Sequence, residues 1–301
     1  ARPEMIPFLV LSLWTAVAVP QDNIIYDDLN TPFALTAVPP QRIVSLTPNI
    51  TEILFALGLG GRVVGVTRFC DFPAEALQKE KIGGMVDPNL EKIESLHPDL
   101  IIAFRGNPLG VLNKLRHLHF PVFVLDLGNS VDGLFQTIDK IGRLTRAEEA
   151  ANLLGGGLKE KLRTIRLALG DISKRPKVFL SVYGQGLWTC GEGSYLNDLL
   201  AQAGGTNIAG TIKRRWLQLN REQFIHENPD IIIIMAKDEA RFSTAGESFR
   251  ADQRLKDVRA VRDDNIHWLD ENVAGRFGPR LIDALDSVAR ILHPEIFEAR
   301  R

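Results

Sequence analysis

Cysteine is scarce in this sequence, which holds only Cys70 and Cys190 among 301 residues. Two cysteines are too few for a disulfide-stapled scaffold, so they either form one bridge between the two halves of the chain or both remain thiols. An excess of one charge sign is also lacking, because 36 Lys and Arg oppose 37 Asp and Glu. No basic run stands out, so the sequence gives no electrostatic reason to expect a nucleic-acid partner.

Catalytic and nucleotide-binding motifs are missing as well. The chain contains no G-x-S-x-G elbow, no HExxH and no GxxxxGK[ST]. His117 and His119 lie two positions apart on a predicted helix, so they point to different sides. The sequence therefore favours a protein that is not an enzyme and has no metal or other cofactor, and it leaves an enzyme open only because α/β chains of this kind also host catalysis.

Only one long apolar run is present, "MIPFLVLSLWTAVAVP" at residues 5–20, with Arg2 ahead of it and an Ala-Val-Ala pattern near its end. The run is shorter than the roughly 20 apolar residues of a spanning helix and has the layout of a secretory signal peptide. We expect residues 1–20 to be a signal peptide and the protein to be exported to the periplasm. A buried N-terminal strand or helix is the alternative.

After this run the hydrophobic pattern alternates between strands and helices. Residues 23–40 predict a short hairpin with Asp28 and Asn30 in its turn. Continuous apolar strands such as "RIVSL" and "PDLIIAF" then alternate with helices, which is typical of a parallel sheet covered on both faces. The alternation resumes at Lys177 after a helical middle segment. We predict an α/β fold of two similar Rossmann-like lobes with a ligand cleft between them.

The expected organisation places the N-terminal lobe with its leading hairpin at residues 21–130, linking helices at 131–172 and the C-terminal lobe at 173–301. Thr145 with Glu148 resembles a capping box, and a backbone helix from Thr145 to Leu169 would measure about 35 to 40 Å. Its glycines at 155–157 weaken it by about 1 kcal/mol each relative to Ala. The helix either bends there or packs closely against another element.

Two segments nearly repeat each other: "NLEKIESLHPDLIIAF" at residues 89–104 and "NREQFIHENPDIIIIM" at residues 220–235. In each, an Asn is placed to cap a short helix, and Glu91 or Glu222 falls in its first turn. A helix-dipole contribution explains each copy alone, but not why both lie at equivalent places in two lobes. Two carboxylates on related surfaces suit a twofold partner that presents cationic side chains.

Aromatic residues and arginines gather in the loops that follow the predicted strands. Aromatic rings offer large flat contact areas, and guanidinium groups bind acidic groups in a fork geometry. The combination suits a large flat ligand with acidic or amide edges, although each aromatic alone is as well explained as core. The candidate ligand-binding residues are Arg68, Phe69, Phe104, Arg105, Tyr183, Trp188, Trp216, Arg276 and Phe277.

The stretch "PPQRIVSLTPNITEILFALGLGGRVVGVTRFCDFPAEA", followed by "VDPNLEKIESLHPDLIIAF", resembles the substrate-binding proteins of ABC importers for cobalamin, ferric siderophores and haem. The resemblance implies two rigid lobes joined by a long helix, with one glutamate per lobe docking on arginines of a dimeric permease. Glu91 and Glu222 match those docking positions.

Within that family, "NLEKIESLHPDLIIAFRG" and "RRWLQLNREQ" look most like the cobalamin binders. By position Phe69, Phe104, Trp188 and Trp216 correspond to their cleft aromatics. Phe replaces Trp at position 104, and other aromatic positions of those proteins fall on "GGMVD" here.

The resemblance therefore implies an exported monomer that captures a corrinoid and delivers it to a membrane permease, with the corrinoid as cargo and not as a cofactor. A ferric siderophore held by Arg68, Arg105 and Arg276 is one alternative, and haem with Tyr183 as axial ligand is another. A metal-dependent enzyme on the same two-lobed scaffold is the alternative from a different class.

Overall fold

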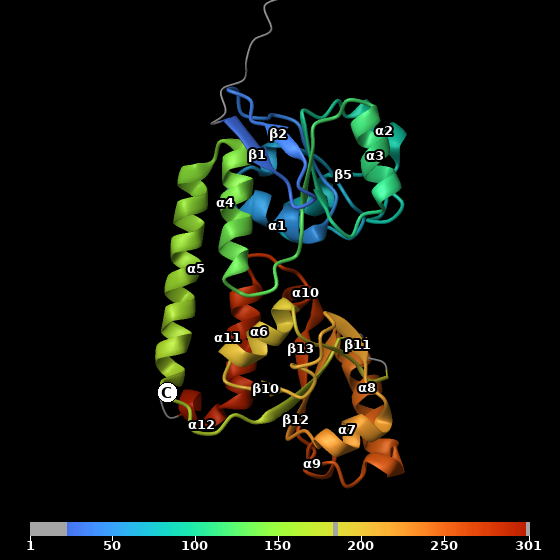
Figure 1. Cartoon of the computed structure of the whole chain (residues 1–301), viewed down its shortest axis with the longest axis vertical. Coiled ribbons are helices and arrows are strands. Elements are labelled where there is room, and N and C mark those ends of the chain that lie inside the picture. The colour runs from blue at the N-terminus through green and yellow to red at the C-terminus, as the bar shows by residue number, and fades with distance from the viewer. Residues whose placement is uncertain (1–22, 183–185, 299–301) are drawn as a thin grey trace, which may run out of the picture.

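Two parallel β-sheets organise the chain, one in each of two lobes that lie one above the other in Figure 1. The computed structural model describes residues 23–182 and 186–298; the expected signal peptide at residues 1–20 and the candidate Tyr183 lie outside them. Among the helices in these two ranges, none combines the length and the apolar character needed to cross a bilayer.

The first lobe opens with the predicted hairpin, β1 (Ile24–Tyr26) paired with β2 (Pro32–Ala34). Asp27 closes its turn by accepting hydrogen bonds from the backbone of Leu29 and Thr31. A five-stranded parallel sheet follows in the order β5 (Glu80–Lys81), β4 (Val63–Val66), β3 (Ile43–Ser45), β6 (Leu100–Phe104) and β7 (Val122–Leu125). Its helices are α1 (Pro48–Ala56), α2 (Leu90–Ser95) and α3 (Leu109–His117), with short 3-10 turns at Gly60–Arg62 and Ala74–Gln78.

The apolar strands of this sheet are buried on both faces, as their sequence predicts. Ile43 and Ile102 pack into one core, and Val44 and Ile101 pack into a second core on the opposite face. Period-two alternation of side chains explains the split, so the sheet is a shared wall between two hydrophobic layers.

The second lobe repeats this plan with a four-stranded parallel sheet in the order β10 (Thr206–Asn207), β8 (Lys177–Ser181), β12 (Ile231–Ala236) and β13 (Ile266–Asp270). Beside it lies an antiparallel ribbon that the sequence did not predict, β9 (Trp188–Cys190) with β11 (Trp216–Gln218). The helices are α6 (Tyr195–Gln202), α7 (Arg221–Glu227), α8 (Glu239–Ala251), α9 (Arg259–Arg262), α10 (Glu271–Ala274), α11 (Leu281–Leu292) and α12 (Pro294–Glu298), with a 3-10 turn at Gln253–Leu255.

Two helices join the lobes, α4 (Gly133–Thr145) and α5 (Glu148–Leu169), and α5 runs along one side of both lobes (Figure 1). The predicted capping box is wrong. Thr145 ends α4, and its hydroxyl donates to the carbonyl of Ile141. Arg146 then adopts a left-handed conformation with φ of 54°, so the chain turns back before α5 begins at Glu148.

The glycines at 155–157 lie within an unbroken α5. A Cβ added at any of the three would meet no heavy atom within 4 Å. Neither a break in the helix nor a close approach by another element therefore accounts for them.

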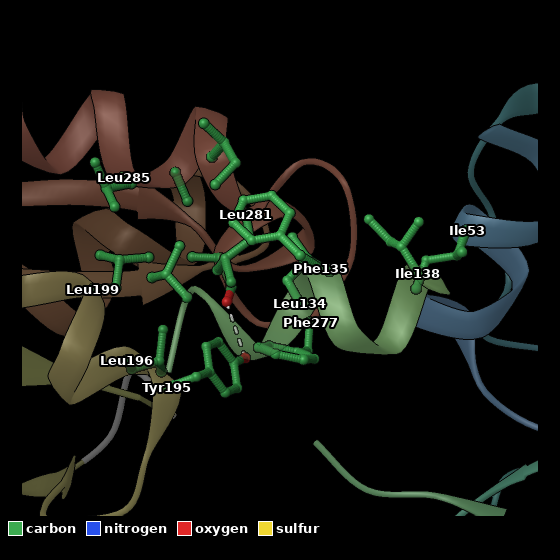
Figure 2. Close-up of a cluster of buried hydrophobic side chains, with 14 of the residues drawn as sticks. Ile53, Leu134, Phe135, Ile138, Tyr195, Leu196, Leu199, Phe277, Leu281 and Leu285 are labelled. Atoms are coloured by element: carbon green, nitrogen blue, oxygen red, sulfur yellow. Dashed lines mark hydrogen bonds between the residues drawn. The ribbon is translucent and has the colours of Figure 1, made fainter. Parts of the chain in front are cut away.

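A single hydrophobic core continues from one lobe into the other. Figure 2 shows Leu134 and Phe135 of α4 between Ile53 of the first lobe and Leu281 of the second. Below them the Tyr195 hydroxyl donates to the carbonyl of Ala274, 3.1 Å away. Because close-packed interiors resist deformation, this shared core opposes independent motion of the lobes.

The two cysteines do not pair, which decides between the alternatives left by the sequence. Cys70 lies in the first lobe, within 3.2 Å of the hydroxyls of Thr51 and Thr67. Cys190 lies on β9 of the second lobe and is fully buried. Each thiol is a core residue of its own lobe.

Candidate ligand cleft

A cavity of about 480 Å³ lies between the lobes. Its walls come from segments that follow the carboxyl ends of parallel strands: Asn49, at the start of α1, follows β3, Phe69 follows β4, Lys237 follows β12, and Glu271, at the start of α10, follows β13. Carboxyl ends of strands in open α/β sheets are where ligands bind, and the volume falls in the range of small-molecule sites. The cleft is therefore the candidate site that the topology favours.

Five of the candidate ligand-binding residues line this cavity: Arg68, Phe69, Phe104, Arg276 and Phe277. Phe69 is 43% exposed and presents its ring to the cavity region. The ring of Phe277 is fully buried against Tyr195, with ring centroids 5.1 Å apart. Phe277 therefore supports the floor of the cleft, whereas Phe69 is open to contact.

The structure does not bring Arg105, Trp188 or Trp216 into the cavity lining. Trp216 belongs to the ribbon strand β11 and packs edge-on against Tyr195. Arg105 pairs instead with Asp126, which also receives Arg215 from the other lobe at 3.3 Å. Trp188 and Trp216 both lie on the ribbon of β9 and β11, which the sequence did not predict, and for that reason their expected place in the cleft was wrong.

The arginines of the cleft are already paired. The guanidinium of Arg68 lies 3.0 Å from a carboxylate oxygen of Asp87. Arg276 lies 2.6 Å from Asp71 and 2.9 Å from Glu52. Partial burial alone would raise the pKa of Asp71, but the hydrogen bond and positive charge of Arg276 outweigh that effect and hold the pKa below its usual range.

Glu52 is the centre of a buried ion cluster that joins the lobes. It projects from α1 of the first lobe and accepts hydrogen bonds from Arg276 and Arg280 of the second. Its side chain is 2% exposed. A carboxylate buried this deeply requires its partners, so the lobe contact behind the cleft is partly ionic.

The charges in and directly behind the cavity balance. Four cations, Arg68, Lys237, Arg276 and Arg280, stand beside four carboxylates, Glu52, Asp71, Asp87 and Glu271. Of these residues the sequence pointed to Arg68, Asp71 and Arg276, but not to Glu52, which lies 224 residues from Arg276.

Lys237 and Glu271 are site residues that the sequence analysis missed. They are the first residues after β12 and β13, two neighbouring strands. Lys237 is the first charged side chain after the apolar strand β12, which is the signal that could have identified it, whereas Glu271 follows a strand that already ends in Asp270.

Outside the cleft, Glu91 and Glu222 are exposed on α2 and α7, which lie on the side of the molecule away from α5 (Figure 1). Asn89 accepts a hydrogen bond from the backbone of Lys92, and Asn220 accepts one from the backbone of Gln223, so both predicted caps are present. Within residues 23–182 and 186–298, neither glutamate forms an ion pair. Both carboxylates are therefore available to a partner.

A metal centre has no support in the part of the chain that the structure describes, where no group of three or more His, Cys, Asp or Glu side chains could hold an ion.

The sequence profile of the periplasmic binding proteins matches residues 43–273. The chain belongs to the periplasmic binding protein family. Like other members of this family, it is a substrate-binding transport protein and not an enzyme, which confirms the prediction from the sequence.

The similarity between this periplasmic binding protein and its relatives extends over most of its length. An uncharacterized ABC transporter substrate-binding lipoprotein of Bacillus subtilis is 30% identical over 281 residues, which cover 90% of this chain and 86% of the relative. The crystal structure of the periplasmic vitamin B12 binding protein of Vibrio cholerae superimposes with a TM-score of 0.74 at 29% identity, covering 85% of this chain and 98% of that one. The periplasmic heme-binding protein of Roseiflexus superimposes with a TM-score of 0.75 at 26% identity, covering 85% and 99%.

Proposed function

We propose that this protein captures a corrinoid of the cobalamin type in the cleft between its lobes and delivers it to the permease of an ABC importer. The balanced charge of the cleft carries the choice of ligand. An anionic ligand needs cationic groups that are not already neutralised, and here Arg68 and Arg276 already have carboxylate partners. A corrinoid, whose ring carries neutral amide groups, does not require free cationic groups.

The apolar part of the lining supports a flat ligand. Phe69, Phe104, Met85 and Leu127 line the first-lobe side of the cavity. Aromatic rings and a methionine offer broad contact to a planar macrocycle at little entropic cost. The vitamin B12-binding relative of Vibrio cholerae has the same fold, which is consistent with this ligand class.

Haem and ferric siderophores are the competing ligands. Haem carries carboxylates and many ferric siderophores are acidic. Lys237 lines the cavity without a carboxylate partner, but the carboxylate of Glu271 stands beside it, so a ligand with several acidic groups would still have to displace Asp71 from Arg276 or Asp87 from Arg68. We therefore expect both to bind more weakly than a corrinoid.

Isothermal titration calorimetry with cyanocobalamin, haemin and a ferric hydroxamate tests the choice. We expect sub-micromolar affinity for cyanocobalamin, with one ligand per chain, and at least tenfold weaker binding of the other two. Tight haemin binding with no cyanocobalamin binding would overturn the corrinoid assignment while leaving the family assignment intact.

The proposed permease contact rests on Glu91 and Glu222, exposed carboxylates on equivalent helices of the two lobes. Glu91→Ala combined with Glu222→Ala should leave cyanocobalamin affinity unchanged and weaken binding to a detergent-solubilised permease complex. Glu149→Ala on α5 is the matched control, because it removes an exposed glutamate from the opposite side of the molecule. Equal loss of permease binding in the control would reject the assignment.

Export to the periplasm belongs to the same proposal. It is supported by the family and by the apolar run at residues 5–20. Fractionation of cells expressing the full chain should recover the protein in the periplasmic fraction, shortened at its N-terminus.

A further inference from the structure

We infer that Lys237 and Glu271 act together as a donor and acceptor pair that recognises carboxamide groups at the edge of the cargo and discriminates against the corresponding carboxylates. This inference rests on the proposed function and adds to it the residues that set ligand specificity.

The backbone places the two residues side by side. Strands β12 and β13 are parallel neighbours, with Ala236 paired to Asp270. Lys237 and Glu271 follow these two residues directly, so they stand at the same level on the cleft edge of the sheet. The hydrogen bond that the Trp268 indole donates to the carbonyl of Ala236, 2.8 Å long, ties the two strand ends together.

Both side chains line the cavity without a polar partner from the protein. Lys237 is exposed and Glu271 is partly buried, and within the described ranges neither takes part in a side-chain hydrogen bond or an ion pair. They also do not pair with each other, since no nitrogen to oxygen distance between them falls within 4.0 Å. Every other charged side chain of the lining is paired.

An unpaired donor beside an unpaired acceptor matches the hydrogen-bonding capacity of a primary amide. The ammonium group of Lys237 donates to the amide carbonyl, and the carboxylate of Glu271 accepts from the amide N–H. A ligand carboxylate can still accept from Lys237, but it offers no N–H to Glu271 and places two negative charges together. Sites built to hydrogen-bond a ligand group discriminate strongly against an analogue that lacks it.

The test compares cobinamide with a corrinoid in which one peripheral amide near this wall is hydrolysed to a carboxylate, for the wild type and for Glu271→Gln. The wild type should bind the amide form about tenfold more tightly, and Glu271→Gln should remove most of that preference, because glutamine can donate to a carboxylate. Lys237→Met should weaken both ligands. Lys256→Met and Glu247→Gln, exposed positions of the same lobe outside the cavity lining, should change neither affinity.

Retention of the full amide preference by Glu271→Gln, with circular dichroism and thermal unfolding unchanged, overturns the inference alone. Absence of any corrinoid binding by the wild type overturns the proposed function and the inference with it. The two failures are therefore distinguishable.

Discussion

The carboxylate of Glu52, in the first lobe, forms a two-pronged contact with the guanidinium of Arg280, in the second lobe, at 2.9 and 2.6 Å. The two residues are separated by most of the chain, and yet they share one buried ion cluster with Arg276. The lobes are therefore joined by charge behind the cleft as well as by the hydrophobic core.

Glu52→Gln should destabilise the protein by about 3 kcal/mol, because it leaves the partly buried guanidinium of Arg280 without a counter-charge and Arg276 with Asp71 as its one carboxylate partner. Urea unfolding followed by circular dichroism measures the change. Glu160→Gln is the control, since Glu160 forms an exposed ion pair with Arg163 on α5, and its unfolding midpoint should stay at the wild-type value. Similar midpoints for both variants would contradict a structural role for the Glu52 cluster.

The ion pair between Asp71 and Arg276 should make stability depend on pH in acid. The pKa of Asp71 in the folded protein is lowered from 3.8, so its contribution is fully present above about pH 4 and is lost as the pH falls through the folded value. Asp71→Asn should therefore be less stable than the wild type at pH 7, and the gap should narrow below pH 4. A gap of constant size from pH 7 to pH 3 would show that the carboxylate charge is not responsible.

Gly156→Ala and Gly157→Ala should each stabilise the protein by about 0.5 to 1 kcal/mol, because alanine loses less backbone entropy in a helix and meets no neighbour here. Thermal unfolding by calorimetry tests this. Gly142→Ala in α4 provides the opposite expectation, since its Cβ would lie 2.5 Å from that of Ala151. A lower melting temperature for the α5 variants would contradict the open space found around these two glycines.

The two cysteines should be inert in the folded protein. Burial raises the pKa of Cys190 to about 12 and also raises the pKa of Cys70. Ellman's reagent at pH 8 should detect no thiol in the native protein and two after unfolding in guanidinium chloride. Only one thiol equivalent reacting in the native state would indicate that one of the lobes opens readily.

Much of the fold was accessible from the sequence. Continuous apolar strands and capped helices predicted both parallel sheets, because these signals depend on short-range pattern. The boundary at Thr145 was mispredicted, because a hydroxyl that fits a capping box equally well donates back to Ile141 at the end of α4. The ribbon of β9 and β11 was missed because each strand has only three residues.

The cleft was harder to predict than the fold. Phe69 and Arg276 were placed in the cavity by their position after strands, which topology decides. The acidic partner Glu52 was not anticipated, because it comes from a helix of the opposite lobe and the ion pair spans a sequence separation of 224 residues. Lys237 was not anticipated either, although it is the first charged residue after the apolar strand β12.

Helix α5 sets the distance between two surface residues that it does not touch. With 22 residues it is about 33 Å long, and it packs against α4, which reaches the first lobe, and against α11 and α12 of the second. Because α5 holds the two lobes at a fixed spacing, it also sets the separation of Glu91 and Glu222 on the far side. Inserting one residue at Gly156 would rotate one end of the helix by about 100° against the other, so such an insertion should misalign the two carboxylates for any partner that must meet both at once.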